Sequence, residues 1–153
     1  MFEPILASLR SWWTRLLASW RGSIKQDSTK SLGRKGEQAA AAYLASQGFR
    51  IIDANVELAA GEADLIALDP DQETYVIVEV KTRARRPGQP LQSAQTPPEA
   101  AITAHKRSKL RQIASHLKRT NQWTRTRVDV IAIEQIEDGG QPRLVIRHHK
   151  DAV

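Results

Sequence analysis

The sequence contains no cysteine, which excludes a disulfide framework and a thiolate metal site. This absence fits a reducing compartment, so we expect a cytoplasmic protein. No run of about 18 uncharged apolar residues occurs, and the chain therefore has no conventional membrane span. Arg10 and Arg15 interrupt the apolar stretch that a secretory signal peptide needs. The 153 residues suit one globular domain with a short appendage.

Acidic residues are almost absent from residues 83–127, which carry eleven Lys or Arg and one acid, a net charge of +10. The preceding residues 33–82 have a net charge of −5. Clustered cations gain affinity by displacing counterions from phosphates, so this asymmetry suggests a polyanionic partner. The alternative interpretation is a solvated basic face of a helix.

Residues 1–21 predict an amphipathic helix, because apolar residues recur at i, i+3, i+4 and i+7 over residues 4–20. Packing on the domain or on a partner helix is the first interpretation. A membrane-surface helix is the second, since Trp suits the headgroup zone and Arg suits anionic lipids. A targeting segment is the third. Residues 22–32 have no such periodicity and predict a linker.

Residues 33–150 predict an α/β domain with a mixed central sheet flanked by helices. The element order is α-β-β-β-α-β-β. Gly48 is placed to stop the first helix, and Thr96 to cap a second helix that opens at Pro97 and Pro98. The expected ranges are a helix from Gly33 to Gly48, strands at 49–58, 62–68 and 74–82, a helix from 97 to about 119, and strands at 127–136 and 143–148.

The hairpin "GEADLIALDPDQETYVIVEVKTR" places carboxylates inside two apolar runs. If a four-residue loop closes on Asp69 facing Thr74, Asp64 lies opposite Glu79, and Glu62 lies opposite Lys81. Facing residues have Cβ atoms about 4.5–5.5 Å apart, and like charges there are destabilising. A slip of one residue would move the two acids to opposite faces of the sheet.

A hard divalent cation would relieve this repulsion. Mg²⁺ and Mn²⁺ bind through one or two carboxylates and keep positions for water and substrate phosphate oxygens. Lys81, two residues after Glu79 and on the same face, can position the attacking water or offset transition-state charge. Cross-strand ion pairs with Lys81 and Arg83 are the alternative. The nearly unbroken apolar run from Tyr75 to Val80 weakens it, since an acid in a doubly covered strand is costly.

The motifs "GRKGEQAAAAYLASQGFRIIDAN", "GEADLIAL", "VIVEVKTR", "HKRSKL" and "RVDVIAI" resemble the YraN family of uncharacterised bacterial proteins. That family is similar to the PD-(D/E)XK nuclease superfamily, especially the archaeal Holliday-junction resolvase branch. The resemblance covers about residues 33–135. It implies a restriction-endonuclease-like αβββαβ core with a metal site on the central sheet.

The resemblance implies that Asp64, Glu79 and Glu37 are metal ligands and that Lys81 is the catalytic lysine. By itself, Glu37 is an ordinary acid near a helix start, favoured by the helix dipole. Ala63 stands where the superfamily has proline, so the first motif rests on "GEAD". Asp129 falls in a motif position, and orienting Arg127 or a neighbouring strand is its preferred role. A further set is predicted to contact nucleic acid: Arg83, Arg85, Arg86, Lys106 and Lys109.

Two functions follow as hypotheses. The first is an endonuclease that depends on Mg²⁺ or Mn²⁺ and hydrolyses phosphodiester bonds of DNA in the manner of a resolvase. The second is a nucleic-acid-binding module with a nuclease fold and no turnover. The intact acids and Lys81 favour the first, because carboxylates without a metal would repel a phosphate. Resolvases commonly act as dimers, so the resemblance also implies a homodimer.

Overall fold

The computed structural model describes residues 28–85, 102–137 and 139–153. The chain divides into two compact units, Met1–Ser31 and Leu32–Val153, and the sheet belongs to the second. The expected amphipathic helix and the capping signal at Thr96 lie outside the described residues. The elements are α2 (Ser28–Ser46), β1 (Arg50–Leu58), β2 (Gly61–Leu68), β3 (Thr74–Arg85), α5 (Ala104–Thr120), β4 (Arg125–Ile136) and β5 (Arg143–His149).

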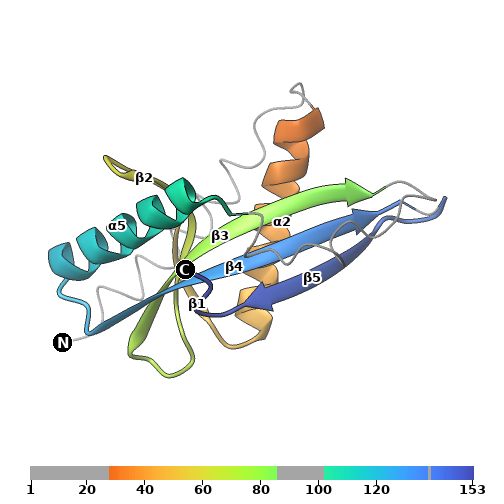
Figure 1. Cartoon of the computed structure of the whole chain (residues 1–153). Helices are drawn as coiled ribbons and strands as arrows, with labels where there is room; N and C mark the ends of the chain where they lie inside the picture. The colour runs from red at the N-terminus through yellow and green to blue at the C-terminus, as the bar shows by residue number, and fades with distance from the viewer. Residues whose placement is uncertain (1–27, 86–101, 138) are drawn as a thin grey trace. The chain divides into compact units, whose positions relative to one another are not determined.

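The five strands form one mixed sheet in which spatial order equals chain order, β1-β2-β3-β4-β5 (Figure 1). Neighbouring strands are antiparallel except for β3 and β4, which run parallel over their whole lengths. A parallel pair needs a crossover connection, and α5 lies in the segment that joins these two strands. The expected α/β class and the order of elements are confirmed.

Strand β3 is a central strand with both faces covered. Val76, Ile77 and Val78 are fully buried, which explains the unbroken apolar run in the sequence. On one face Ile77 packs in a cluster with the buried stripe of α5. Thr82, five residues later and therefore on the opposite face, meets α2 at Gly36. The stripe of α5 follows the 3.6-residue period and consists of Leu110, Ile113, Ala114 and Leu117.

Helix α2 begins at Ser28, so residues 28–32 are helical and the predicted linker is wrong there. The two glycines that suggested a helix start lie inside the helix. A Cβ at Gly36 would overlap the Thr82 hydroxyl, so close approach of helix and strand requires glycine at this position. The predicted stop is confirmed. Gly48 has a φ of 85°, and the N–H groups of Gly48 and Phe49 bond Ala45 and Leu44 in a Schellman motif.

Helix α5 begins at Ala104, not at Pro97, because Ile102 and Thr103 are not helical. The Thr103 side chain accepts a hydrogen bond from the backbone N–H of Lys106 at 3.2 Å and caps the helix. This cap fixes Lys106 in the first turn. None of the helices in the described ranges is long and apolar enough to cross a membrane.

The predicted hairpin register is confirmed at the turn. The Asp69 N–H bonds the Thr74 carbonyl, and four pairs follow in the expected register, ending at Leu65↔Val78. Beyond that pair β2 continues only with β1, and β3 continues only with β4. Glu62 pairs with Glu57 of β1, so its predicted position opposite Lys81 is wrong. We call this parting of β2 and β3 the fork; the two strands diverge in Figure 1.

Candidate active site

The fork holds the two carboxylates that the hairpin pattern singled out. Asp64 is the first residue of β2 beyond the last β2–β3 pair, and its carboxylate accepts a hydrogen bond from the Val80 N–H at 2.6 Å. This side chain therefore satisfies a backbone donor that loses its partner where the strands separate. Glu79 lies next to that donor on β3. The two acids thus face one another across the opening of the fork.

Glu79 is buried, with 3% of its side chain exposed, and two lysines approach it. Lys81 Nζ donates a hydrogen bond to Oε1 at 2.6 Å. Lys106 Nζ from α5 lies 2.8 Å from Oε2. The second approach is an ion pair whose direction is unsuited to a hydrogen bond, since Oε2 has no hydrogen-bond partner. One oxygen of a buried carboxylate is thus balanced in charge but not hydrogen-bonded.

The charges at the fork act on Asp64. Burial, followed by the negative charge of Glu79, raises the pKa of Asp64 to about 6, and the charge of Glu37 contributes in the same direction. The Val80 hydrogen bond and the Lys106 charge oppose this rise. Glu37, Glu79 and Lys106 thus all act electrostatically on Asp64.

Glu37 reaches this neighbourhood from α2. Burial raises its pKa, the hydrogen bond from the Asn55 side chain lowers it, and the charge of Glu62 raises it further. Asn55 lies between the pairs Ala54↔Leu65 and Val56↔Ala63, so its place on β1 is opposite Asp64. Its φ is 52°, a left-handed conformation that is rare within a strand. The backbone of β1 thus adopts an unusual conformation at the residue that bonds Glu37.

Asn55 is the site residue that sequence reasoning missed. Asparagine is disfavoured in strands and tolerates positive φ, so its presence within an expected strand was an available signal.

Glu37, Asp64 and Glu79 do not form a preformed three-carboxylate metal site. Within the described ranges, no group of three or more His, Asp or Glu side chains lies close enough together to hold a metal ion. The fork supplies two carboxylates from adjacent strands, with Glu37 interacting at longer range. Mg²⁺ commonly uses one or two protein carboxylates and completes its shell with waters and phosphate oxygens.

The predicted nucleic-acid contacts occupy different places. Lys106 belongs to the fork through its ion pair with Glu79. Arg83 is exposed on β3, two residues beyond Lys81 and on the same face. The alkyl stem of Lys109 lies over Gly61, where an added Cβ would be 3.7 Å from Lys109 Cδ. The side chains of Arg85 and Arg86 lie outside the described part of the structure.

Asp129 has a structural role, which agrees with the preferred sequence interpretation. It is fully buried on β4, and Arg127 donates hydrogen bonds to both of its oxygens at 2.7 and 3.0 Å. His148 on β5 lies 2.8 Å from Oδ2, and the Asp151 N–H donates to Oδ1. Burial opposes ionisation, but these hydrogen bonds outweigh it and lower the pKa of Asp129. Arg127 also pairs with Asp69 at the hairpin turn.

Comparison with known proteins agrees with the motif resemblance. The model of "Uncharacterised protein family UPF0102" matches residues 36–133, which include Glu37, Asp64, Glu79 and Lys106. A UPF0102 protein of Arthrobacter sp. is 42% identical over 116 residues, covering 74% of this chain and 89% of the relative. One from Rhodococcus opacus is 43% identical over 124 residues, covering 80% and 95%. The chain therefore belongs to the UPF0102 family, the YraN family of the sequence motifs.

Proposed function

We propose that the fork is the active site of an endonuclease that hydrolyses phosphodiester bonds of DNA and depends on Mg²⁺ or Mn²⁺. The observation that carries the proposal is the pairing of Asp64 and Glu79 across two separating strands, with Lys81 and Lys106 beside them. Two acids and a lysine at one strand opening form a site for a cation and a phosphate together. The order α2-β1-β2-β3-α5-β4 supports a restriction-endonuclease-like core.

The donor set fits a hard divalent cation. Oε2 of Glu79 is buried and meets only the Lys106 ammonium, in an ion pair, and Asp64 has a second oxygen besides the one that Val80 occupies. Both are carboxylate oxygens, the ligands that Mg²⁺ and Mn²⁺ prefer. When bound, such a cation supplies Lewis-acid stabilisation of phosphoryl oxygens and lowers the pKa of a water.

The side chains of the chain itself have separate roles in this proposal. Val80 holds Asp64 in a fixed orientation, so the carboxylate is preorganised. Lys81, with 43% of its side chain exposed, is accessible to the reacting phosphate and offsets charge that develops on its oxygens. Lys106, which pairs with Glu79 in the metal-free protein, would be available to bind a phosphate of the substrate backbone if Glu79 held a cation. Asn55 orients Glu37 behind these groups.

The second candidate function is nucleic-acid binding without turnover. It is favoured by the two lysines on Glu79, which neutralise this acid with no cation present. The two functions differ in what the acids do. A binding module needs the lysines alone, whereas an endonuclease needs Asp64 and Glu79 as well.

The deciding experiment is calorimetric titration with Mg²⁺ and Mn²⁺, combined with cleavage of a labelled four-way junction, a flap and a single strand. The wild type is compared with Asp64→Asn/Glu79→Gln and with Asp53→Asn/Glu137→Gln, a control that removes two exposed carboxylates elsewhere. We expect metal binding and cleavage in the wild type and the control, and neither in the fork variant. No metal binding by the wild type, with or without DNA, would overturn the proposal and leave nucleic-acid binding without turnover as the function.

Light scattering of the junction complex tests the proposed homodimer.

A further inference from the structure

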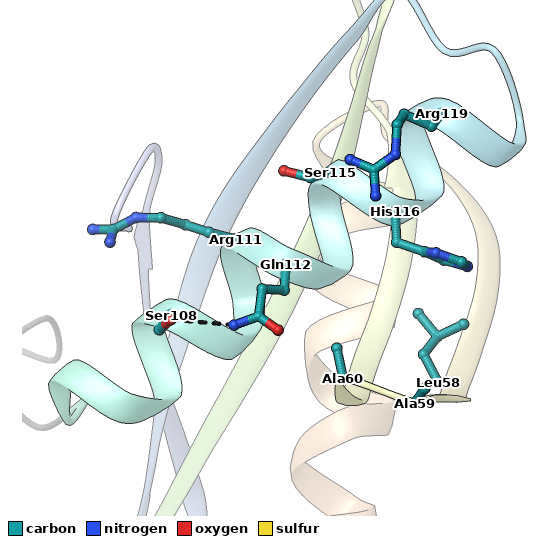
Figure 2. A pocket seen from close by; sticks show the side chains of 9 residues that line it. All are labelled: Leu58, Ala59, Ala60, Ser108, Arg111, Gln112, Ser115, His116 and Arg119. Carbon is teal, nitrogen blue, oxygen red and sulfur yellow. Dashed lines mark hydrogen bonds between the residues drawn. The ribbon is translucent and has the colours of Figure 1, made fainter.

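A groove of about 470 Å³ runs between one face of α5 and the turn that joins β1 to β2. We call it the arginine groove. Figure 2 shows Gln112 and His116 on the side of α5 that faces the turn, whereas the Arg111 side chain extends away from the turn and Arg119 lies near the other end of the row. The groove is lined by Leu58, Ala59, Ala60, Ser108, Arg111, Gln112, Ser115, His116 and Arg119. None of these residues entered the candidate active site.

The lining has the chemistry of an anion site. Helix α5 contains six Lys or Arg residues and neither Asp nor Glu. Arg111 and Arg119 are exposed, and neither forms an ion pair with any residue that the structure describes. Hydroxyl and amide donors lie between them, and Gln112 Nε2 donates to Ser108 Oγ at 3.3 Å. Phosphates are bound in proteins by this combination of guanidinium groups and neutral donors.

The groove and the fork share helix α5 but use different faces of it, because Arg111 and Arg119 each lie about 140° around the helix axis from Lys106. Lys106, in the first turn of α5, contacts Glu79 in the fork. With a rise of about 1.5 Å per residue, Arg111 lies roughly 7 Å and Arg119 roughly 20 Å farther along the helix axis. One strand of duplex DNA rises about 3.4 Å per nucleotide. The groove therefore spans distances of about two to six nucleotides from a phosphate at the fork.

We propose that the arginine groove binds the phosphodiester backbone of the duplex arm next to the bond at the fork. The proposal rests on the proposed function, because it takes the fork as the place of the reacting phosphate. Arg111 and Arg119 each pair with a phosphate, and the serine and glutamine groups donate hydrogen bonds between them. Contacts to phosphates carry no sequence information, so the groove sets affinity and register on the duplex rather than base preference.

The test is the salt dependence of binding to a labelled 30-base-pair duplex and to a junction, measured by fluorescence anisotropy. Arg111→Gln/Arg119→Gln is compared with Lys118→Gln/Arg143→Gln, which removes the same charge from exposed positions outside the groove. Each phosphate contact contributes about 0.9 to the slope of log K against log salt. We expect the groove variant to lower the slope by about 2, which corresponds to a roughly 60-fold lower affinity at 0.1 M salt for equal affinities at 1 M salt. The control is expected to keep the wild-type slope, and circular dichroism checks that both variants fold.

Methylphosphonate substitution locates the contact. Neutral linkages two to six nucleotides from the cleaved bond should weaken binding by the wild type and have no further effect on the groove variant. Equal slopes in the groove variant and the control variant would contradict the proposed phosphate contacts in the groove and would leave the endonuclease proposal unaffected. If the groove variant lowers the salt slope but the wild type shows no metal-dependent cleavage, the endonuclease proposal is wrong and the groove is still a DNA contact. Absence of DNA binding by the wild type would overturn both.

Discussion

The Asp64 carboxylate lies 2.6 Å from the backbone N–H of Val80, immediately beyond the last pair of the β2–β3 ladder. A side chain here takes the position that a strand carbonyl would take in a continued hairpin. The hydrogen bond joins the two strands after their backbones have separated, and it leaves the other oxygen of Asp64 outside this bond. The acid therefore closes the sheet locally and serves the proposed site with the same carboxylate.

Asp64 makes the metal-free protein less stable as the pH rises. Its pKa is raised to about 6 in the folded chain from an ordinary value of 3.8, so the folded state binds more protons between these values. Stability from this group is fully present below about pH 4 and is lost as the pH rises through 6. The loss amounts to at most about 3 kcal/mol. Asp64→Asn retains an acceptor for Val80 and should remove this dependence.

The measurement is urea unfolding in EDTA at pH 5 and pH 7.5. The free energy of unfolding of Asp64→Asn should exceed that of the wild type at pH 7.5, and the difference should shrink at pH 5. Asp71→Asn provides a control of opposite sign. The pKa of Asp71 is lowered from 3.8 to about 2 by hydrogen bonds from Thr74 and Glu73, so its stabilisation is lost only below about pH 4, and Asp71→Asn should lower the free energy of unfolding equally at pH 5 and pH 7.5. A pH-independent difference for Asp64→Asn would contradict the prediction.

Lys106→Met should destabilise the metal-free protein because it leaves the buried Glu79 charge with one cation instead of two. The loss of a partner from a buried charge costs about 1–3 kcal/mol. Methionine retains the aliphatic packing of the lysine stem. Lys118→Met, at an exposed position on the same helix, should change the free energy of unfolding by less than about 0.5 kcal/mol. Chemical denaturation of both variants measures these changes. Equal losses in the two variants would contradict a stabilising role for the Lys106–Glu79 ion pair.

Asn55→Gly should raise the pKa of Glu37 with little loss of stability. Glycine adopts the φ of 52° freely but lacks the amide whose hydrogen bond lowers that pKa. Asn55→Ala should raise the pKa equally and also destabilise the fold by about 1 kcal/mol, because alanine is strained at positive φ. Carboxyl NMR titration of Glu37 and thermal unfolding separate the two effects. An unchanged titration in Asn55→Gly would show that Asn55 does not act on Glu37.

Asp129→Asn should reduce stability by about 3–5 kcal/mol, because it removes the buried charge that the partly buried Arg127 and His148 face. The metal affinity of the remaining folded protein should equal that of the wild type, since Asp129 bonds these partners and not the fork residues. Urea unfolding and calorimetry on the same samples test both parts. A loss of metal binding in fully folded protein would instead assign Asp129 to the site.

The two glycines of α2 should respond to alanine in opposite ways. Gly36→Ala should destabilise by about 1–3 kcal/mol because its Cβ overlaps the Thr82 side chain. Gly33→Ala meets no atom within 4 Å and should stabilise the helix by about 0.5–1 kcal/mol. Thr82→Ala should recover part of the Gly36→Ala loss, since it removes the hydroxyl and leaves the Cβ. Melting temperatures of the four variants test this, and equal effects of the two alanines would contradict the packing argument.

Local patterns predicted the hairpin well, since the turn at residues 70–73 sets the register of the strands next to it. The same patterns predicted continued pairing of Glu62 with Lys81. That prediction is wrong because pairing with β1 and β4, strands outside the hairpin, draws β2 and β3 apart. A local rule contains no information about these neighbours.

Helix starts were predicted less well than helix stops. Gly48 acts through a conformation that glycine favours by itself, and the sequence therefore located the end of α2 correctly. The predicted start of α2, at Gly33, is too late, because the prediction treats glycine there as the helix boundary; Gly33 and Gly36 both lie inside the helix, and Gly36 admits Thr82. For α5, the sequence predicted a cap at Thr96 and a start at Pro97, whereas the structure shows that Thr103 caps the helix. Spacing and resemblance singled out the acids and lysines of the candidate site, whereas the contact of Asn55 with Glu37 depends on a backbone conformation that these patterns do not contain.

The parallel pairing of β3 with β4 gives the protein an order of assembly. Residues from α2 through β3 are made first and can form local contacts, but Asp64 and Glu79 then lie together without Lys106. That lysine arrives with α5, in the connection that brings β4 beside β3. Closure of the long loop therefore also brings the second lysine to the buried carboxylate, which already has Lys81 beside it on β3. A nascent or truncated chain that ends before α5 lacks one of the two cations that balance Glu79, so completion of the sheet and full charge balance at the fork come together.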